Sequence, residues 1–137
     1  MTATPVFPQT VKTNVSQILP ADTTTLKTLV TPGTNGTRID NIFVSSTDTS
    51  AKDLQFVLTV SSVDYVIGTL SIPANTGFTN SVPSISVFAH SQFVALNNDV
   101  NGNKHLFLAN GAVLKVKSLS NVTTAKAISI IAQCGDF

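Results

Sequence analysis

The sequence predicts an all-β protein, an antiparallel β-sandwich of about eight to ten strands with a jelly-roll-like arrangement. The stretch from Leu54 to Ile72 indicates this most clearly, because apolar residues recur at every second position, stop at Ser61 and Ser62, and then resume. Side chains alternate between the two faces of a strand with a period of two, whereas a helix repeats every 3.6 residues. We therefore expect a central β-hairpin with one buried face.

The composition favours the same fold class. Thr, Ser and Asn are abundant, and all seven acidic residues are Asp. Thr and Val favour pleated surfaces and Asn and Asp favour turns, whereas exposed helices ordinarily use Glu heavily. We therefore expect helix over less than about 10% of the chain. A chain of 137 residues can bury a sufficient core without a metal or a disulfide.

Turn signals divide the rest of the chain into short strands. Pro-Gly and Asn-Gly pairs mark turns because glycine adopts a positive φ without steric cost, and Asn101 with Gly102 predicts a type I′ hairpin turn. Residues 89–98 fit a short helix as well as a strand. The other predicted strands cover residues 10–19, 26–30, 37–46, 85–88, 105–108, 113–119 and 125–134.

The last two predicted strands each show one buried face. In the first, Leu114 and Val116 alternate with Lys115 and Lys117. In the second, a single face carries Ile128, Ile130, Ala132 and Cys134. A sheet with one solvated side has this alternation. We expect Cys134 to be buried and unreactive.

Residues 1–8 are expected to form an extended arm, and residues 9–137 a single sandwich domain. Pro5 and Pro8 oppose a helix there, since proline fixes its own backbone angle and biases the preceding residue to extended conformations. Val6 and Phe7 form an apolar pair that either tucks onto its own domain or reaches a neighbour. Phe78, inside the polar loop 74–82, is either a plug over the core or a contact for a partner.

Charge and cysteine content exclude several partners. A net charge of +1 and a pI near 7.9 give no basic surface, so nucleic acid is not an expected partner. No segment approaches the ~18 apolar residues of a membrane span, and the start of the chain lacks the pattern of a secretion signal. A membrane is therefore not expected as a partner. Cys134, the only cysteine, cannot form an internal disulfide, which suits a reducing cytoplasm.

Metal-binding patterns are weak. Asp99, Asn101 and Asn103 are spaced like part of a calcium loop, but Leu108 stands where an EF-hand needs its bidentate Glu. We interpret this segment as a structural turn. The remaining candidates, His90, His105 and Cys134, show no close pairing of the kind that zinc ligands have. We expect no metal and no cofactor.

Catalytic patterns are equally weak. A glycosidase needs two carboxylates that converge on a sugar cleft, and Asp40 and Asp64 are the candidates because each lies within a predicted strand. Isolated Asp residues on such strands usually face solvent, so we expect no enzyme. Sugar sites often stack the ligand on exposed aromatic side chains, but the chain has no Trp and a single Tyr. That residue, Tyr65, falls on the core-like face of the predicted hairpin.

Four segments together resemble small structural proteins of tailed bacteriophages, and most of all the jelly-roll decoration, or cement, proteins of their icosahedral heads. The resemblance spans roughly residues 34–137. The segments are Gly36 to Asp40 (GTRID), Ser46 to Asp53 (STDTSAKD), Ile67 to Gly77 (IGTLSIPANTG) and the ending Ala125 to Phe137, which closes with GDF.

The resemblance implies a non-enzymatic virion protein, made in the host cytoplasm, that binds the outside of the capsid shell. Its expected partners are the major capsid protein and further copies of itself, as a dimer or trimer. The leading contact residues are Val6, Phe7 and Phe78. One alternative is a tail-associated or receptor-binding module whose loops engage a host glycan. Another is an ordinary bacterial ligand-binding domain.

Overall fold

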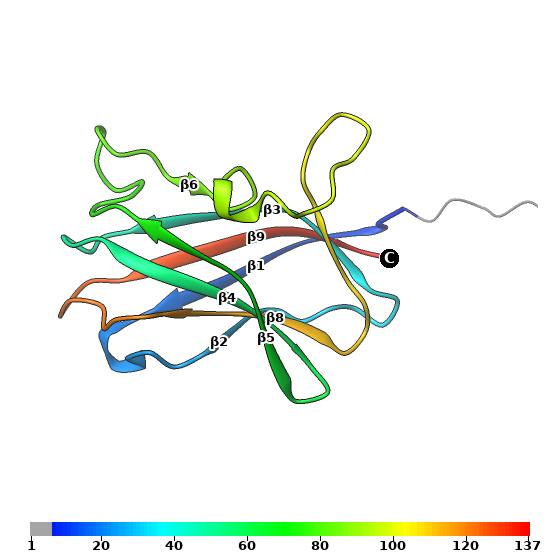
Figure 1. Cartoon of the computed structure of the whole chain (residues 1–137), viewed down its shortest axis with the longest axis horizontal. Coiled ribbons are helices and arrows are strands. Elements are labelled where there is room, and N and C mark those ends of the chain that lie inside the picture. The colour runs from blue at the N-terminus through cyan, green and yellow to red at the C-terminus, as the bar shows by residue number, and fades with distance from the viewer. Residues whose placement is uncertain (1–6) are drawn as a thin grey trace, which may run out of the picture.

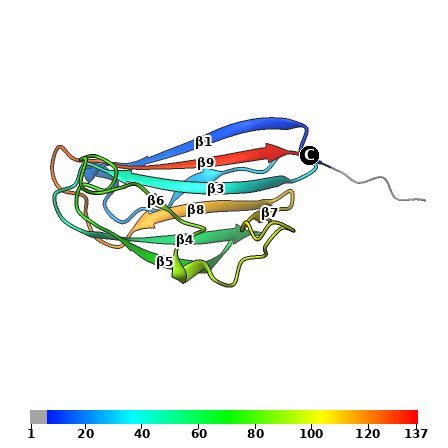
Figure 2. The ribbon, with the colours of Figure 1, turned by 90° about the horizontal axis from the view of Figure 1, so that it is seen from above.

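Nine strands form two packed antiparallel sheets in a computed structural model that describes residues 7–137 (Figures 1 and 2). Val6 lies outside the described residues. The strands are β1 (Thr10–Ile18), β2 (Lys27–Val30), β3 (Thr37–Ser46), β4 (Lys52–Val60), β5 (Val63–Ile72), β6 (Ile85–Ser86), β7 (Leu106–Leu108), β8 (Ala112–Ser118) and β9 (Ile128–Asp136). Two short 3-10 turns, η1 (Pro20–Asp22) and η2 (Ser91–Phe93), are the helical elements of this region. The predicted all-β sandwich is confirmed.

The strand order follows from doubling the chain back on itself at the β4–β5 hairpin. Moving outward from that hairpin, β3 pairs with β6 and β7, β2 with β8, and β1 with β9, all antiparallel. The doubled chain wraps alternately into two sheets. Sheet A has the order β1-β9-β3-β6, with β7 also on β3, and sheet B has the order β2-β8-β4-β5. This is the strand order of a jelly roll in which β6 and β7 share one strand position.

The central hairpin is present as predicted, and Ser61 and Ser62 form its two-residue turn. Ser61 and Ser62 have φ values of 51° and 63°. Positive φ at both central residues defines a type I′ turn, whose twist suits the flanking strands. The pairing of β4 with β5 skips Ile67 between Phe56 and Val57. This bulge increases the local twist of the hairpin.

The core lies between the inner faces of the two sheets. Inner-face residues of both sheets form it, including Cys134, and the core cluster contains aliphatic side chains from both sheets with Phe56, Phe88 and Phe93. Phe93 meets Phe56 edge to face, with ring centroids 5.7 Å apart. The same ring lies against Gly68 of β5, where an added Cβ would come within 2.7 Å of it.

Residues 87–105 differ from the sequence expectation. The predicted strand 85–88 stops at Ser86, because Val87 and Phe88 turn into the core. The ambiguous stretch 89–98 contains η2, whose first turn is capped by His90 as its Nδ1 accepts a hydrogen bond from the N–H of Gln92 at 3.2 Å. No helix among the described residues has the length and apolar character of a membrane span.

The predicted type I′ hairpin at Asn101 and Gly102 is wrong. Gly102 has a positive φ of 83°, but Asn101 does not. The carboxylate of Asp99 accepts hydrogen bonds from the N–H groups of Asn101 and Asn103, at 2.8 and 2.9 Å. These bonds stabilise a different turn, as Asp side chains often do. The chain does pair across this turn, through a bridge between Asn98 and Lys104 and a hydrogen bond from the N–H of His105 to the carbonyl of Asn97 at 3.1 Å. The strand that follows, β7, pairs with β3.

Candidate functional site

The outer face of sheet A is almost free of charge. Its strands alternate between buried inner residues and outer residues that are apolar or uncharged and polar. Within the described chain, the charged side chains on this face are Arg38 and Asp40, whose Nε and Oδ1 atoms form an ion pair at 2.7 Å. The other outer residues of the three long strands are Val11, Thr13, Val15 and Gln17 of β1, Ser129, Ile131, Gln133 and Gly135 of β9, and Asn41, Phe43 and Ser45 of β3.

An apolar row crosses this face at its centre. Val15 of β1 is the direct cross-strand partner of Ile131 in β9, and Ile131 is the direct partner of Phe43 in β3. Val15 is 61% exposed, and the other two are partly exposed. Such a row on an otherwise polar sheet face is typical of a surface that contacts another protein.

The outer face of sheet B has a different character. Its outward residues include Lys115 and Lys117 of β8, Asp53 of β4 and Asp64 of β5. Charged residues are depleted at the centres of protein interfaces and common on solvated surfaces. The outer face of sheet A is therefore the better candidate for a contact with another protein, and it is called the contact face below.

One end of the contact face is bordered by Phe7. Its side chain is 68% exposed. The neighbouring Pro8 packs so closely on Gly135 of β9 that an added Cβ on this glycine would lie 2.6 Å from the proline Cβ. Phe7 and Pro8 line a hollow together with Val11 and other outer residues of sheet A. The described end of the arm, Phe7 and Pro8, therefore lies on this face.

The other end is bordered by Phe78, in the loop between β5 and β6. This loop is held against the end of β3, since the N–H of Ser46 donates to the carbonyl of Thr76 at 2.7 Å. Phe78 is 61% exposed and lies outside the core cluster, so it does not plug the core. It lines a small hollow with outer residues of sheet A, among them Gln17 and Ser45.

Phe7 and Phe78 therefore frame the same sheet face from opposite ends. The first lines its hollow with Arg38 near the start of β3, and the second lines its hollow with Ser45 near the end. Seven residues of strand at ~3.3 Å each separate those two positions by about 23 Å. The sequence offered no signal that Phe7 and Phe78 lie at the same sheet face. It did contain a signal for an apolar outer face, because Val11 and Val15 alternate out of phase with the buried Ile18.

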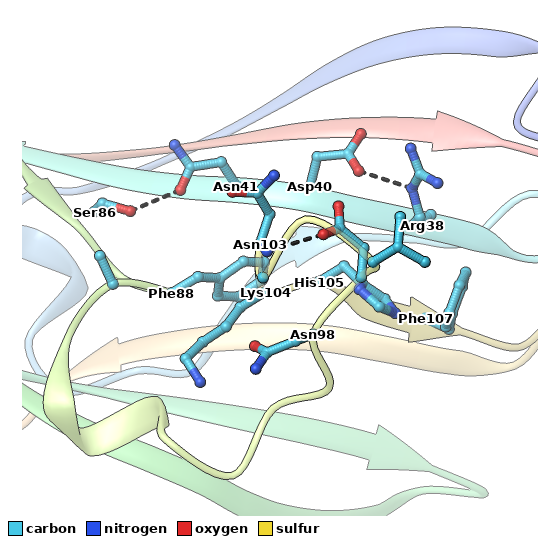
Figure 3. A pocket seen from close by; sticks show the side chains of 14 residues that line it. Arg38, Asp40, Asn41, Ser86, Phe88, Asn98, Asn103, Lys104, His105 and Phe107 are labelled. Atoms are coloured by element: carbon cyan, nitrogen blue, oxygen red, sulfur yellow. Dashed lines mark hydrogen bonds and ion pairs between the residues drawn. The ribbon is translucent and has the colours of Figure 1, made fainter.

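A groove of about 830 Å³ lies beside the contact face, where β3 is paired by β6 at one end and by β7 at the other (Figure 3). Several of its polar groups already have hydrogen-bond partners. Ser86 donates to the Oδ1 of Asn41 at 2.8 Å, and Lys104 donates to the carbonyl of Val94 at 3.2 Å. The N–H of Asn103, with that of Asn101, lowers the pKa of the Asp99 carboxyl. The bonds of Lys104 and Asp99 lie within segment 94–104 and stabilise its conformation beside the groove.

The structure separates the two carboxylates considered for a glycosidase. Asp40 lies on sheet A and is paired with Arg38. Asp64 lies on sheet B and accepts a hydrogen bond from the hydroxyl of Thr59 at 2.6 Å. Tyr65 shares the inner face of β5 as predicted but is half exposed, because it lies near the hairpin tip.

The three candidate metal ligands lie in separate settings. His90 caps η2, and His105 packs against Phe107 with ring centroids 4.7 Å apart. Cys134 is buried in the core, where burial raises its thiol pKa to about 11. Among residues 7–137, no group of three or more His, Cys, Asp or Glu side chains is arranged to hold a metal ion.

Comparisons with known proteins do not place the chain in a family. No family model and no curated protein matches it. Among solved structures, a chain of the cyanophage Pam1 capsid asymmetric unit is similar over 98% of this chain and 91% of its own length, with 13% identity and a TM-score of 0.46. A chain of the virus-like particle of extra small virus from the giant freshwater prawn Macrobrachium rosenbergii covers 100% and 86%, with 9% identity and a TM-score of 0.35. Likeness at this level assigns neither a family nor a function.

Proposed function

We propose that this chain is a structural protein of a virion, which binds the outside of the capsid shell as a decoration protein through the outer face of sheet A. The observation that carries the proposal is the nearly uncharged sheet face, crossed by an apolar row and framed by Phe7 and Phe78. The jelly-roll strand order supports it, because this fold is common in viral capsid domains. The sequence resemblance to phage decoration proteins is consistent with this proposal.

The area of the contact face is smaller than a stable interface needs, so additional contacts are required for shell binding. Three strands about 4.8 Å apart and nine residues long have a footprint of about 400 Å². A stable interface needs about 800 Å² from each partner. The arm at Phe7 and the loop at Phe78 extend the footprint at both ends. Copies that are linked into an oligomer further multiply a weak contact through their effective concentration.

In this proposal the chain has no catalytic role. A virion protein of this kind acts through surface area. Its partners are the major capsid protein and further copies of itself, and its location is the capsid surface. The competing function is a tail-associated module that binds a host glycan.

Co-sedimentation with shells of the encoding virus, prepared without this protein, tests the proposal. Val15→Lys places a charge in the apolar row and is expected to weaken shell binding by more than about tenfold. Val94→Lys is the matched control, since Val94 is 74% exposed and lies away from the contact face. Deletion of residues 2–8 and Phe78→Ala test the two ends. The proposal fails if Val15→Lys binds shells as well as Val94→Lys, or if the protein sediments with tails and a glycan competes for it.

A further inference from the structure

The edges of the two sheets differ in how they are protected. A sheet edge exposes backbone groups that can pair with another chain, so proteins usually cover it or place lysine on it. The edge strands β1 and β2 protect each other. Lys27 of β2 donates to the carbonyl of Gln17 in β1 at 2.6 Å, and Lys12 of β1 donates to the carbonyl of Thr31 at 2.9 Å.

The far edge of sheet B is covered over only half its length. Phe93 of η2 packs on Gly68 in the middle of β5. The first half of β5, from Val63 to Val66, is exposed at every residue. Figure 1 shows this end of the β4–β5 hairpin projecting from the margin of the molecule. The segment has no lysine or proline, and the carboxylate of its one charged residue, Asp64, is engaged with Thr59.

This exposed segment is apolar on both faces of the sheet. Val63 and Tyr65 lie on the inner face, where they pair with Val60 and Leu58 of β4. Val66 lies on the outer face and is 59% exposed. A strand that exposes apolar side chains on both faces and a free backbone edge has the features of a pairing site.

The hairpin geometry fixes which backbone groups are free. Residues flanking a two-residue turn form a hydrogen-bonded pair, so the N–H and C=O groups of Val63 point toward β4. Alternation then directs the backbone groups of Tyr65 toward β4 as well. It directs those of Asp64 and Val66 toward the open edge.

We propose that the first half of β5 pairs with the same segment of a second copy, antiparallel about a two-fold axis, and joins two B sheets into one. A two-fold axis makes identical strands run antiparallel. The free backbone groups of this edge can therefore form hydrogen bonds with the same groups of a second copy, and no other partner sequence is needed. Homodimer interfaces are also more apolar than transient ones, which suits this patch better than the mixed polar face of sheet A.

The register follows from the free groups and the charge. With Tyr65 opposite its own symmetry copy, Asp64 stands opposite Val66 of the partner. The outward backbone groups of Asp64 and Val66 then form four hydrogen bonds across the axis. A register centred on Asp64 would place two like charges opposite each other, which destabilises strand pairs.

Site-specific cross-linking tests this register. Residues in a non-hydrogen-bonded pair have Cα atoms about 4.5 Å apart, within disulfide range. Tyr65→Cys is therefore expected to give a covalent dimer on mild oxidation, at least about tenfold faster than Val66→Cys or Val15→Cys, whose copies do not stand opposite each other. The buried Cys134 can stay in place. Equal rates for Tyr65→Cys and Val66→Cys, or no dimer from either, would overturn the proposal.

Sedimentation equilibrium of the otherwise unmodified protein gives an independent measurement. The mass is expected to rise from monomer toward dimer with concentration. Val66→Lys should abolish this rise, and Val15→Lys should preserve it, because these valines have nearly equal exposure on different sheets. Circular dichroism checks that both variants are folded. If Val15→Lys abolishes the rise in mass and Val66→Lys preserves it, the β5 contact is refuted. The proposal of shell binding would still stand.

Discussion

Asp48 and Thr123 are joined by two hydrogen bonds although 75 residues separate them. The N–H and the hydroxyl of Thr123 donate to the two carboxylate oxygens of Asp48, each at 2.8 Å. The N–H and hydroxyl of Ser50 donate to the same carboxylate. Burial raises the pKa of Asp48, but these hydrogen bonds outweigh it and hold that pKa well below its usual range. The carboxylate thereby fastens the loop before β4 to the loop before β9.

Removal of this carboxylate is expected to destabilise the fold. Asp48→Ala removes the buried carboxylate that accepts four hydrogen bonds from Thr123 and Ser50, which should cost about 3 kcal/mol of unfolding free energy. Urea unfolding measures the loss. Asp53→Ala on the outer face of sheet B is the control and should change stability by less than about 0.5 kcal/mol. Equal losses in the two variants would show that Asp48 is no anchor.

The same site predicts a dependence of stability on pH. The folded pKa of Asp48 is lowered, so its contribution is complete above the unfolded pKa of about 3.9 and is lost as pH falls toward the folded pKa. The stability advantage of the natural protein over Asp48→Asn should therefore shrink below about pH 4. Unfolding curves for both proteins between about pH 7 and pH 2 measure this. A gap that is constant or widens in acid would contradict the assignment.

Gly68 is expected to tolerate no side chain while Phe93 is present. A Cβ at this position would lie 2.7 Å from the tip of the Phe93 ring, so Gly68→Ala should cost about 1–3 kcal/mol through overpacking. Phe93→Leu removes the clash, and the alanine should then cost less in that background. A double-mutant cycle from thermal unfolding measures the coupling. Additive effects of the two substitutions would mean that Phe93 is not the cause of the destabilisation by Gly68→Ala.

Cys134 should react slowly with thiol reagents. It is buried in the core, and burial raises its pKa to about 11, so very little thiolate exists at neutral pH. Labelling in native buffer is expected to follow the rate of unfolding and to accelerate in urea. Rapid labelling of the folded protein would disprove the prediction.

Periodicity predicted the faces of the strands well, because it depends on local geometry that each residue shares with its neighbours. The hairpin at residues 54–72 and the buried face of β9 are examples. Periodicity does not show what lies opposite a face. Tyr65 has the phase of a core residue, yet its position near the hairpin tip leaves it half exposed.

The contact face could not be predicted because it is assembled by distant pairing. Val15, Ile131 and Phe43 become neighbours only through the register of β1, β9 and β3. The turn at Asn101 shows a second limit. The local Asn-Gly signal was strong, but the side chain of Asp99 offers the backbone a competing set of hydrogen bonds.

The position of β9 has a consequence for biosynthesis. This strand is translated last of the nine, yet it lies between β1 and β3 and supplies the hydrogen-bonding partner of both. A nascent chain still lacking residues 128–136 therefore cannot close sheet A, however long it waits on the ribosome. Pairing of the first strand with the last also gives the fold a high contact order, which slows folding. Sheet A is thus expected to form only after β9 has left the ribosome, and β1 and β3 lack their shared partner until then.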